Sequence, residues 1–264
     1  MSTVTVNTPD GAALKVHRQG TGTPLFLVSG LGGTAAFWQS AIDAFGAGFE
    51  VITFDQRGIN ASTRGTAEVT IDQLARDVIT ICASCGINRA VFLGHSTGGC
   101  IVQTLAAIAP DLIDRLVLSA AWARPSKFMQ SLFQFRLHLL QTDPKGYVES
   151  ATLLSFAPEW LENNWDRYDR ATANPPHDPQ EQTIIAERIS ALLSYDGSQL
   201  MKHMPAGSLV LGTEDDMIVP AFLQRDLAEQ IPDANLQLLA TGGHFYPLSR
   251  ADAFAALVSD WMRS

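Results

Sequence analysis

Residues 90–98 read Ala-Val-Phe-Leu-Gly-His-Ser-Thr-Gly and place one serine, Ser96, between two different hydrophobic patterns. The apolar run 90–93 is typical of a strand buried on both faces, and residues 98–109 have the pattern of a buried helix. A strand-to-helix turn this sharp crowds the backbone, and glycines two residues either side of the serine, Gly94 and Gly98, relieve that crowding. The stretch therefore predicts an α/β sheet with a serine hydroxyl held at its edge. An ordinary glycine-rich turn is the alternative.

The same alternation of strand and helix extends along most of the chain. Further apolar runs typical of strands are at 25–28, 51–54, 116–118, 209–211 and 236–239. Helical patterns are at 71–84, 221–230 and 252–263. Residues 4–6 and 14–17 flank Pro9-Asp10-Gly11 and predict a leading hairpin. Alternating strands and helices predict a mostly parallel sheet covered on both faces.

Residues 124–203 interrupt this alternation, because they contain no strand-like run. The segments 127–140, 146–154 and 182–194 have helical periodicity instead. A helical insertion between two parallel strands is expected over the carboxyl edge of the sheet, where ligands bind in open α/β folds. The sequence thus predicts a core domain of residues 1–123 and 204–264 and a helical cap, or lid, of residues 124–203.

The composition excludes several classes of protein. The chain has 264 residues, of which 46% are hydrophobic and 17% charged, as in a globular protein rather than a disordered one. A net charge of −9 repels phosphate backbones, so no nucleic-acid partner is expected. Without an 18-residue apolar run or a secretion signal in residues 1–11, we expect no membrane partner and a cytoplasmic location. The oligomeric state is left open, and a homodimer is compatible with the sequence.

Cysteine and histidine spacing gives no prediction of a metal site or a cofactor. Cys82 and Cys85 have the spacing of a redox pair or of half a zinc site. They lie at the end of a helical pattern with no second ligand pair nearby, which favours small buried helix residues. The histidines are scattered and have no metal-binding spacing.

A serine nucleophile needs a base, and that base needs a third group to orient it. Of the six histidines, His244 follows the last predicted strand and precedes the terminal helix, which makes it the candidate base. The acid is expected after a late strand, and 209–211 leads into Glu214, Asp215 and Asp216. Spacing alone leaves these three carboxylates open.

Backbone N–H groups that hold a developing oxyanion are predicted at two places. One is the amide of Thr97, directly after the candidate nucleophile. The other is in the glycine-rich loop 29–33, Ser-Gly-Leu-Gly-Gly, where Leu31 is the best-placed donor. A phosphate-binding loop is the alternative. However, the loop has neither the Gly-Lys-Ser/Thr ending of a nucleotide-binding loop nor the G-x-G-x-x-G spacing of a dinucleotide-binding motif.

With these residues identified, the chain resembles the α/β-hydrolase superfamily over nearly all its length, in the order serine, acid, histidine. Segments 28–33, 54–58 and 242–244, and the lid segments 135–140 and 156–160, are similar to the branch of aminoacrylate hydrolases and 3-oxoadipate enol-lactonases. The resemblance implies an eight-stranded, mostly parallel sheet with a lid after the sixth strand. It also selects Asp216, four residues before Pro220, as the acid. Residues 29–30 and 59–62 depart from the commoner motifs of the superfamily.

Four further residues are candidates for substrate contacts. They are Trp122, Arg124, Arg136 and Phe245. If the substrate carries a carboxylate, as the resemblance implies, one of the two arginines is expected to bind it in a bidentate fork. The alternative is that each arginine pairs with an acid of the protein, such as Glu149, Glu159 or Glu162.

We expect a cofactor-independent serine hydrolase that cleaves a small acyl substrate with an ester, lactone, amide or enamine-type bond. Ser96 would attack, His244 would act as base, and Asp216 would orient the imidazole. A cofactor-free dioxygenase or a C–C bond hydrolase that uses the His–Asp pair is the second hypothesis. A protein that keeps the triad only to bind a ligand is the third.

Overall fold

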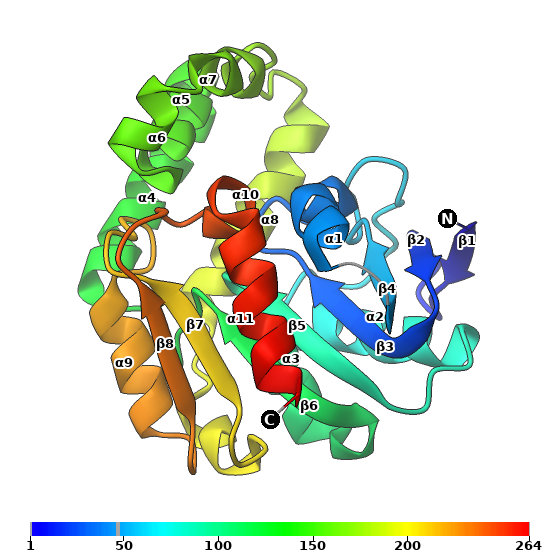
Figure 1. The fold of residues 1–264 in the computed structure, drawn as a ribbon. Coiled ribbons are helices and arrows are strands. Elements are labelled where there is room, and N and C mark those ends of the chain that lie inside the picture. Colours follow the sequence, from blue (N-terminus) through cyan, green and yellow to red (C-terminus); the bar gives the residue numbers. More distant parts are fainter. Residues whose placement is uncertain (1, 46–47, 264) are drawn as a thin grey trace.

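The computed structural model describes residues 2–45 and 48–263 and contains one eight-stranded sheet (Figure 1). The strands are β1 (Ser2–Asn7), β2 (Ala13–Gly20), β3 (Gly22–Val28), β4 (Gly48–Phe54), β5 (Ala90–His95), β6 (Ile113–Ser119), β7 (Leu209–Thr213) and β8 (Asn235–Leu239). They lie in the order β1-β2-β4-β3-β5-β6-β7-β8. The pairs β1–β2 and β2–β4 are antiparallel and the other pairs are parallel. The predicted leading hairpin and mostly parallel sheet are therefore confirmed.

Helices cover both faces of this sheet (Figure 1). Those of the core are α1 (Gln39–Phe45), α2 (Ile71–Ser84), α3 (Thr97–Ile108), α9 (Ala221–Glu229), α10 (Tyr246–Ser249) and α11 (Ala251–Arg263). Residues on β3 alternate between two apolar clusters: Leu25 and Leu27 pack with α1 and α11, and Phe26 and Val28 pack with α2 and α3. Each strand buried on both faces thus contributes to two cores.

The segment between β6 and β7 is helical. It contains α4 (Lys127–Thr142), α5 (Pro144–Ser155), α6 (Pro158–Glu162), α7 (Trp165–Thr172), α8 (Pro179–Ser194) and the 3₁₀ helix η3 (Ser198–His203). The side chains of Ser126, Asp143 and Asp178 cap the amino-terminal amides of α4, α5 and α8. Helices α5, α6 and α7 form a lobe beyond the end of the sheet, and α8 returns from it to the core (Figure 1).

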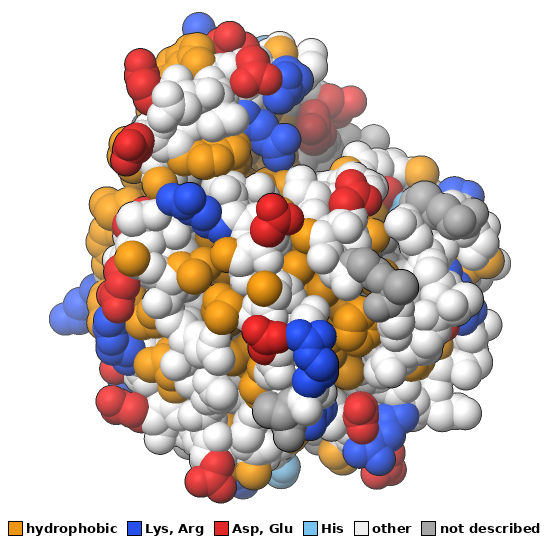
Figure 2. Space-filling model, in the orientation of Figure 1, with side chains coloured by type: hydrophobic (Ala, Val, Ile, Leu, Met, Phe, Trp, Pro, Cys, Tyr) orange, Lys and Arg blue, Asp and Glu red, His pale blue; other side chains and the backbone are white. Residues whose placement is uncertain are grey.

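The surface charge, the length of the helices and the burial of Cys82 bear on three expectations from the sequence. On the face seen in Figure 2, acidic and basic side chains are scattered and form no single basic patch. Within the described residues, no helix is both long enough and apolar enough to cross a bilayer. Cys82 is buried in α2, where burial and the neighbouring Cys85 raise the pKa of its thiol to about 12.

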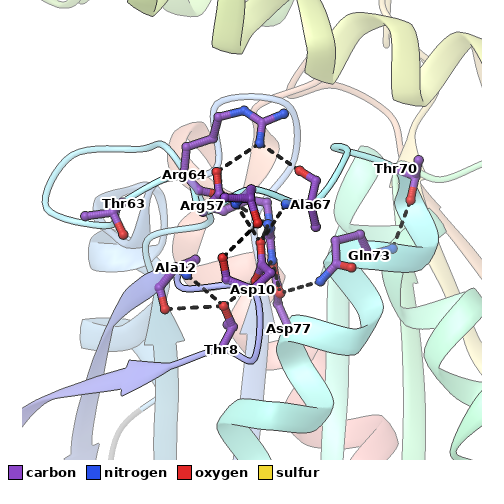
Figure 3. Close-up of polar contacts among 12 residues, drawn as sticks. Thr8, Asp10, Ala12, Arg57, Thr63, Arg64, Ala67, Thr70, Gln73 and Asp77 are labelled. Atoms are coloured by element: carbon purple, nitrogen blue, oxygen red, sulfur yellow. Dashed lines mark hydrogen bonds and ion pairs between the residues drawn. The ribbon is translucent and has the colours of Figure 1, made fainter.

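A buried ion-pair network fixes the loop after β4 (Figure 3). Arg57 donates to Asp77 of α2 at 2.6 Å and to Asp10 of the β1–β2 turn at 2.8 Å. These partners hold the preceding residue, Gln56, against the loop after β3, where its side-chain amide donates to the Ser29 carbonyl at 2.7 Å. Through Gln56, the network thereby stabilises the glycine-rich loop 29–33.

Candidate active site

Ser96 stands on a strained turn between β5 and α3. Its backbone has φ 57° and ψ −124°, a conformation that L-residues rarely adopt and that is typical of functional positions. The residue is 5% exposed. Because α3 begins at Thr97, the amino-terminal end of this helix lies directly beside the serine, where its dipole favours negative charge.

The glycines two residues either side of Ser96 are required by close backbone contacts. A Cβ on Gly94 would collide with the carbonyl of Gly98, and a Cβ on Gly98 would collide with the carbonyl of Val28. The glycine pattern around the serine is therefore explained by steric exclusion rather than by chain flexibility.

His244 lies on the loop after β8 and contacts one of the three candidate carboxylates. Its Nδ1 is 2.8 Å from Asp216 Oδ2, and both side chains are buried. The other oxygen of Asp216 accepts from the amides of Ile218 and Val219, each at 2.8 Å. The carboxylate is therefore held by three partners, and the histidine ring is oriented through it.

The two neighbouring carboxylates have other partners. Asp215 accepts from the amides of Gly242 at 3.1 Å and Gly243 at 2.9 Å, and so shapes the loop that presents His244. Glu214 forms an exposed ion pair with Arg225. Of the three acids left open by spacing, only Asp216 contacts the histidine.

The structure does not join all three candidate triad residues by hydrogen bonds. Among the described residues, there is no hydrogen bond between Ser96 Oγ and His244. The ring of His95, the residue before Ser96, lies 4.9 Å from the His244 ring, measured between ring centroids. In ligand-free sites such bonds are often long and shorten when substrate binds.

The loop after β3 brings Gly30, the residue before Leu31, close to the serine. A Cβ built on Gly30 would lie 3.0 Å from Ser96 Cβ and 3.4 Å from Ser96 Oγ. Thr97 is the first residue of α3, so its N–H has no acceptor within the helix. No described residue accepts from the Leu31 N–H, and both predicted oxyanion donors are thus available.

His95 was not among the predicted site residues. It is fully buried, and burial together with the neighbouring His244 lowers its pKa well below 6.5. Its Nδ1 lies 2.9 Å from Ser119 Oγ, which lies 2.5 Å from the Tyr246 hydroxyl, and that hydroxyl donates to the Leu211 carbonyl. Because a carbonyl only accepts, Ser119 must donate to Tyr246, and His95 carries its proton on Nδ1.

Aromatic side chains of the core and of the lid meet beside His244. Phe245 packs edge-on against Phe156 of the lid, with ring centroids 5.5 Å apart, and against Phe37 at 5.3 Å. The Phe245 amide also donates to the Ser155 carbonyl at 2.8 Å. Trp122, three residues after β6, is fully buried, and its indole Nε1 has no partner among the described residues. Phe156, from the helical segment between β6 and β7, therefore adds apolar surface next to Phe245, whose ring contacts that of His244.

The two candidate arginines are in different environments. Arg136 is buried in α4, with its guanidinium 4.9 Å from the Tyr147 ring and 5.2 Å from the Phe133 ring. Arg124 is exposed and lines a groove of about 750 Å³ between α4, α8 and α9, apart from the candidate triad. Within the described part of the chain, neither arginine forms an ion pair, so the acids expected as alternative partners are not used.

A further arginine, Arg188 of α8, contacts the loop after β3 and was missed by the sequence analysis. Its Nε donates to the Leu31 carbonyl at 2.7 Å. The signal in the sequence was its place between Ile184 and Leu192, four residues from each, on the buried stripe of the helix.

In residues 2–45 and 48–263, no group of His, Cys, Asp and Glu side chains could hold a metal ion.

Comparisons with known proteins agree with the fold. A family model described as the alpha/beta hydrolase fold matches residues 23–251. The chain is 33% identical to the putative carbamate hydrolase RutD of Azorhizobium caulinodans over 92% of each chain. It is 32% identical to the RutD of Caulobacter segnis over 95% of this chain and 96% of that one. The solved enol-lactonase of Burkholderia xenovorans superimposes over the whole of both chains with a TM-score of 0.87 and 25% identity.

Proposed function

Because the chain belongs to the α/β-hydrolase fold family, we propose that this hydrolase cleaves a small acyl substrate through a covalent intermediate on Ser96. The observation that carries the proposal is the strained backbone of Ser96 at the amino terminus of α3, together with the buried His244–Asp216 pair. Strain of this kind is kept only where the surrounding structure enforces it.

In the proposed mechanism, Ser96 Oγ attacks the substrate carbonyl while His244 takes the hydroxyl proton. Asp216 holds the imidazole in the required tautomer and stabilises the imidazolium. The amides of Leu31 and Thr97 donate to the oxyanion of the tetrahedral intermediate. Collapse of that intermediate breaks the bond to the leaving group, which receives the proton from His244, and leaves an acyl-enzyme. Water activated by His244 then releases the acid.

The substrate class follows from the chemistry of the site and from the relatives. The relatives named above are a putative carbamate hydrolase and an enol-lactonase, and both names point to a substrate with a carbonyl group. We infer that the substrate is a small ester, lactone or carbamate-type compound. The apolar cover formed by Phe156 and Phe245 supports a compact acyl group in a site with little water.

The test is the turnover of a panel of small esters, lactones and carbamates by the wild-type protein and by Ser96→Ala. We expect the variant to lose several orders of magnitude in kcat while it keeps its fold, since the nucleophile is absent. Full activity of Ser96→Ala would exclude the acyl-enzyme. Activity that requires dioxygen and survives the substitution would favour an oxygenase that uses the His–Asp pair.

A further inference from the structure

Arg57 and Arg188 are both removed from solvent, but their charges are compensated in different ways. Arg57 is held by two carboxylates, those of Asp77 and Asp10 (Figure 3). Arg188 is 2% exposed, and within the described residues it has no carboxylate partner. Burying an arginine without an acid is costly, so its neutral partners need an explanation.

The acceptors of Arg188 are oxygens around the candidate oxyanion hole. Its Nε donates to the Leu31 carbonyl at 2.7 Å, and its Nη2 donates to the Gly30 carbonyl at 3.2 Å. Nη2 also donates to Gln56 Oε1 at 2.5 Å, and Gln56 in turn holds Ser29. The guanidinium thus binds Gly30 and Leu31 directly and Ser29 through Gln56, so it contacts three successive residues of one loop.

The bond to the Gly30 carbonyl has a geometric consequence for the neighbouring amide. The Gly30 carbonyl and the Leu31 N–H belong to the same trans peptide, in which the two groups point in opposite directions. The Gly30 carbonyl also accepts from the Gly33 N–H at 3.0 Å, and the bond from Arg188 adds to this turn. With the carbonyl held in this direction, the Leu31 N–H points away from Arg188. Gly30 itself lies against Ser96, as its 3.0 Å approach to Ser96 Cβ shows.

We propose that Arg188 is a positioning residue of the oxyanion hole, through which lid helix α8 sets the direction of the Leu31 amide. The proposal rests on the function proposed above. The cation also polarises the Gly30–Leu31 peptide and so makes its N–H a stronger donor. As negative charge appears on the substrate oxygen, a buried cation with no carboxylate stabilises the transition state more than the ground state.

Arg188 keeps its proton under ordinary conditions. Burial lowers its pKa to about 10, and interaction with Tyr147 opposes part of that decrease. The guanidinium is therefore charged at neutral pH, although no acid compensates it.

The residue beside Arg188 supplies a matched control. Glu187 also ties α8 to the core, through a bidentate ion pair with Arg64 at 2.7 and 2.9 Å, but it does not contact the loop after β3. Glu187→Gln therefore weakens the attachment of α8 without removing a bond to Gly30 or Leu31. Arg188→Met removes those bonds and keeps a long apolar side chain, and Arg188→Lys keeps the charge on a single donor nitrogen.

The experiment measures kcat and KM for a neutral ester and for an anionic ester of similar size, and the inhibition constant of a trifluoromethyl ketone of similar shape. The ketone forms a hemiketal oxyanion when Ser96 Oγ adds to it and His244 takes the proton. For Arg188→Met we expect kcat to fall about 10- to 100-fold, somewhat less than for complete loss of an oxyanion donor, with KM nearly unchanged. The ketone should lose affinity by the same factor as kcat/KM. Arg188→Lys should recover part of the loss, and Glu187→Gln should keep wild-type kcat.

Two outcomes would overturn the inference. Equal losses in Glu187→Gln and Arg188→Met would mean that only the attachment of α8 matters. A loss confined to anionic esters would mean that Arg188 binds the substrate's charge. Failure of the wild-type protein to hydrolyse esters or bind the ketone would contradict the proposed function instead.

Hydrogen–deuterium exchange of residues 29–34 in the ligand-free protein tests the hold of Arg188 on the loop without any catalysis. We expect faster exchange in Arg188→Met than in Glu187→Gln. Identical exchange would also overturn the inference.

Discussion

Three adjacent carboxylates have three different tasks in this protein. Asp216 contacts His244, Asp215 holds the amides of the loop that carries His244, and Glu214 pairs with Arg225 at the surface. Sequence spacing could not separate them, because the direction of each side chain depends on the turn after β7. The resemblance to the α/β hydrolases selected Asp216 where the residue pattern alone did not.

Asp216→Asn and Asp215→Asn should therefore have different effects. The first should lower kcat by about 10⁴, because an amide does not hold the required histidine tautomer. The second should lower the melting temperature and change kcat much less, because Asp215 binds only backbone amides. Steady-state kinetics and thermal unfolding of both variants decide between the two roles. A greater loss of kcat in Asp215→Asn would contradict the assignment.

His95 predicts a loss of stability in acid. Burial and the neighbouring His244 depress its pKa in the folded state, whereas the unfolded chain binds a proton near pH 6.5. Below that pH the unfolded state holds more protons, so the free energy of unfolding falls as the pH decreases.

His95→Asn keeps a donor toward Ser119 and removes the titrating ring. Between pH 6.5 and 5, the free energy of unfolding of this variant should depend on pH less steeply than that of the wild-type protein. The difference should be up to about 1.4 kcal/mol per pH unit. Chemical denaturation at a series of pH values measures both slopes, and parallel slopes would show that His95 does not titrate as proposed.

The elements that meet at the serine turn leave no room for a side chain at Gly98. A methyl group there would collide with the Val28 carbonyl of β3, which pairs directly with β5. We expect Gly98→Ala to destabilise the protein by at least about 3 kcal/mol. Gly32→Ala, where no atom lies within 4 Å of the new methyl, should change stability by less than about 1 kcal/mol. Wild-type stability of Gly98→Ala in denaturant would contradict this packing.

The lid helices α4 and α8 each carry an arginine on the apolar stripe that faces the protein interior. On α4, Arg136 follows Phe133 and precedes Leu140, and all three are buried. A charged residue on such a stripe costs stability unless a partner meets it, which makes it a signal of function. From the sequence, Arg136 was a candidate for binding a substrate carboxylate, whereas Arg188 was not a candidate for any role.

Arg136 remains the better candidate to bind a substrate carboxylate, because it is buried and has no acid partner among the described residues. Arg136→Met should raise KM about 10-fold or more for monomethyl succinate and leave the neutral methyl 4-oxopentanoate unaffected. Exposed Arg124 supplies the control, and Arg124→Met should leave both KM values unchanged. Equal losses of Arg136→Met on both esters would show that this arginine is structural.

Across the whole molecule, sequence patterns predicted the elements that are buried on both faces. The five strands β3 to β7, which contain buried runs, and helix α2 were located closely, because continuous apolar runs and helical periodicity reflect burial directly. Strand β8 was also located, although it lies at the sheet edge and is partly exposed. The short helices α1, α6 and α7 were missed. Helix α7 buries no residue, and α1 buries only Ala41 and Phe45, so neither has a clear apolar pattern.

The candidate site could be predicted only where chemistry follows a local motif. Ser96 is marked by its glycines, and His244 by its place after the last strand. His95 and Arg188 were missed, because their importance depends on contacts across the fold, with Ser119 and with the Leu31 carbonyl. Such contacts join residues far apart in the chain and leave no spacing to recognise.

The central claim is a covalent intermediate on Ser96, and mass spectrometry of the protein during turnover tests it most directly. Rapid acid quenching of the wild-type protein with an activated ester should trap one acyl group, and peptide mapping should place it on Ser96. The adduct should form at least as fast as product appears and should be absent from Ser96→Ala. Undiminished ester hydrolysis by Ser96→Ala, with no adduct on either protein, would contradict the account.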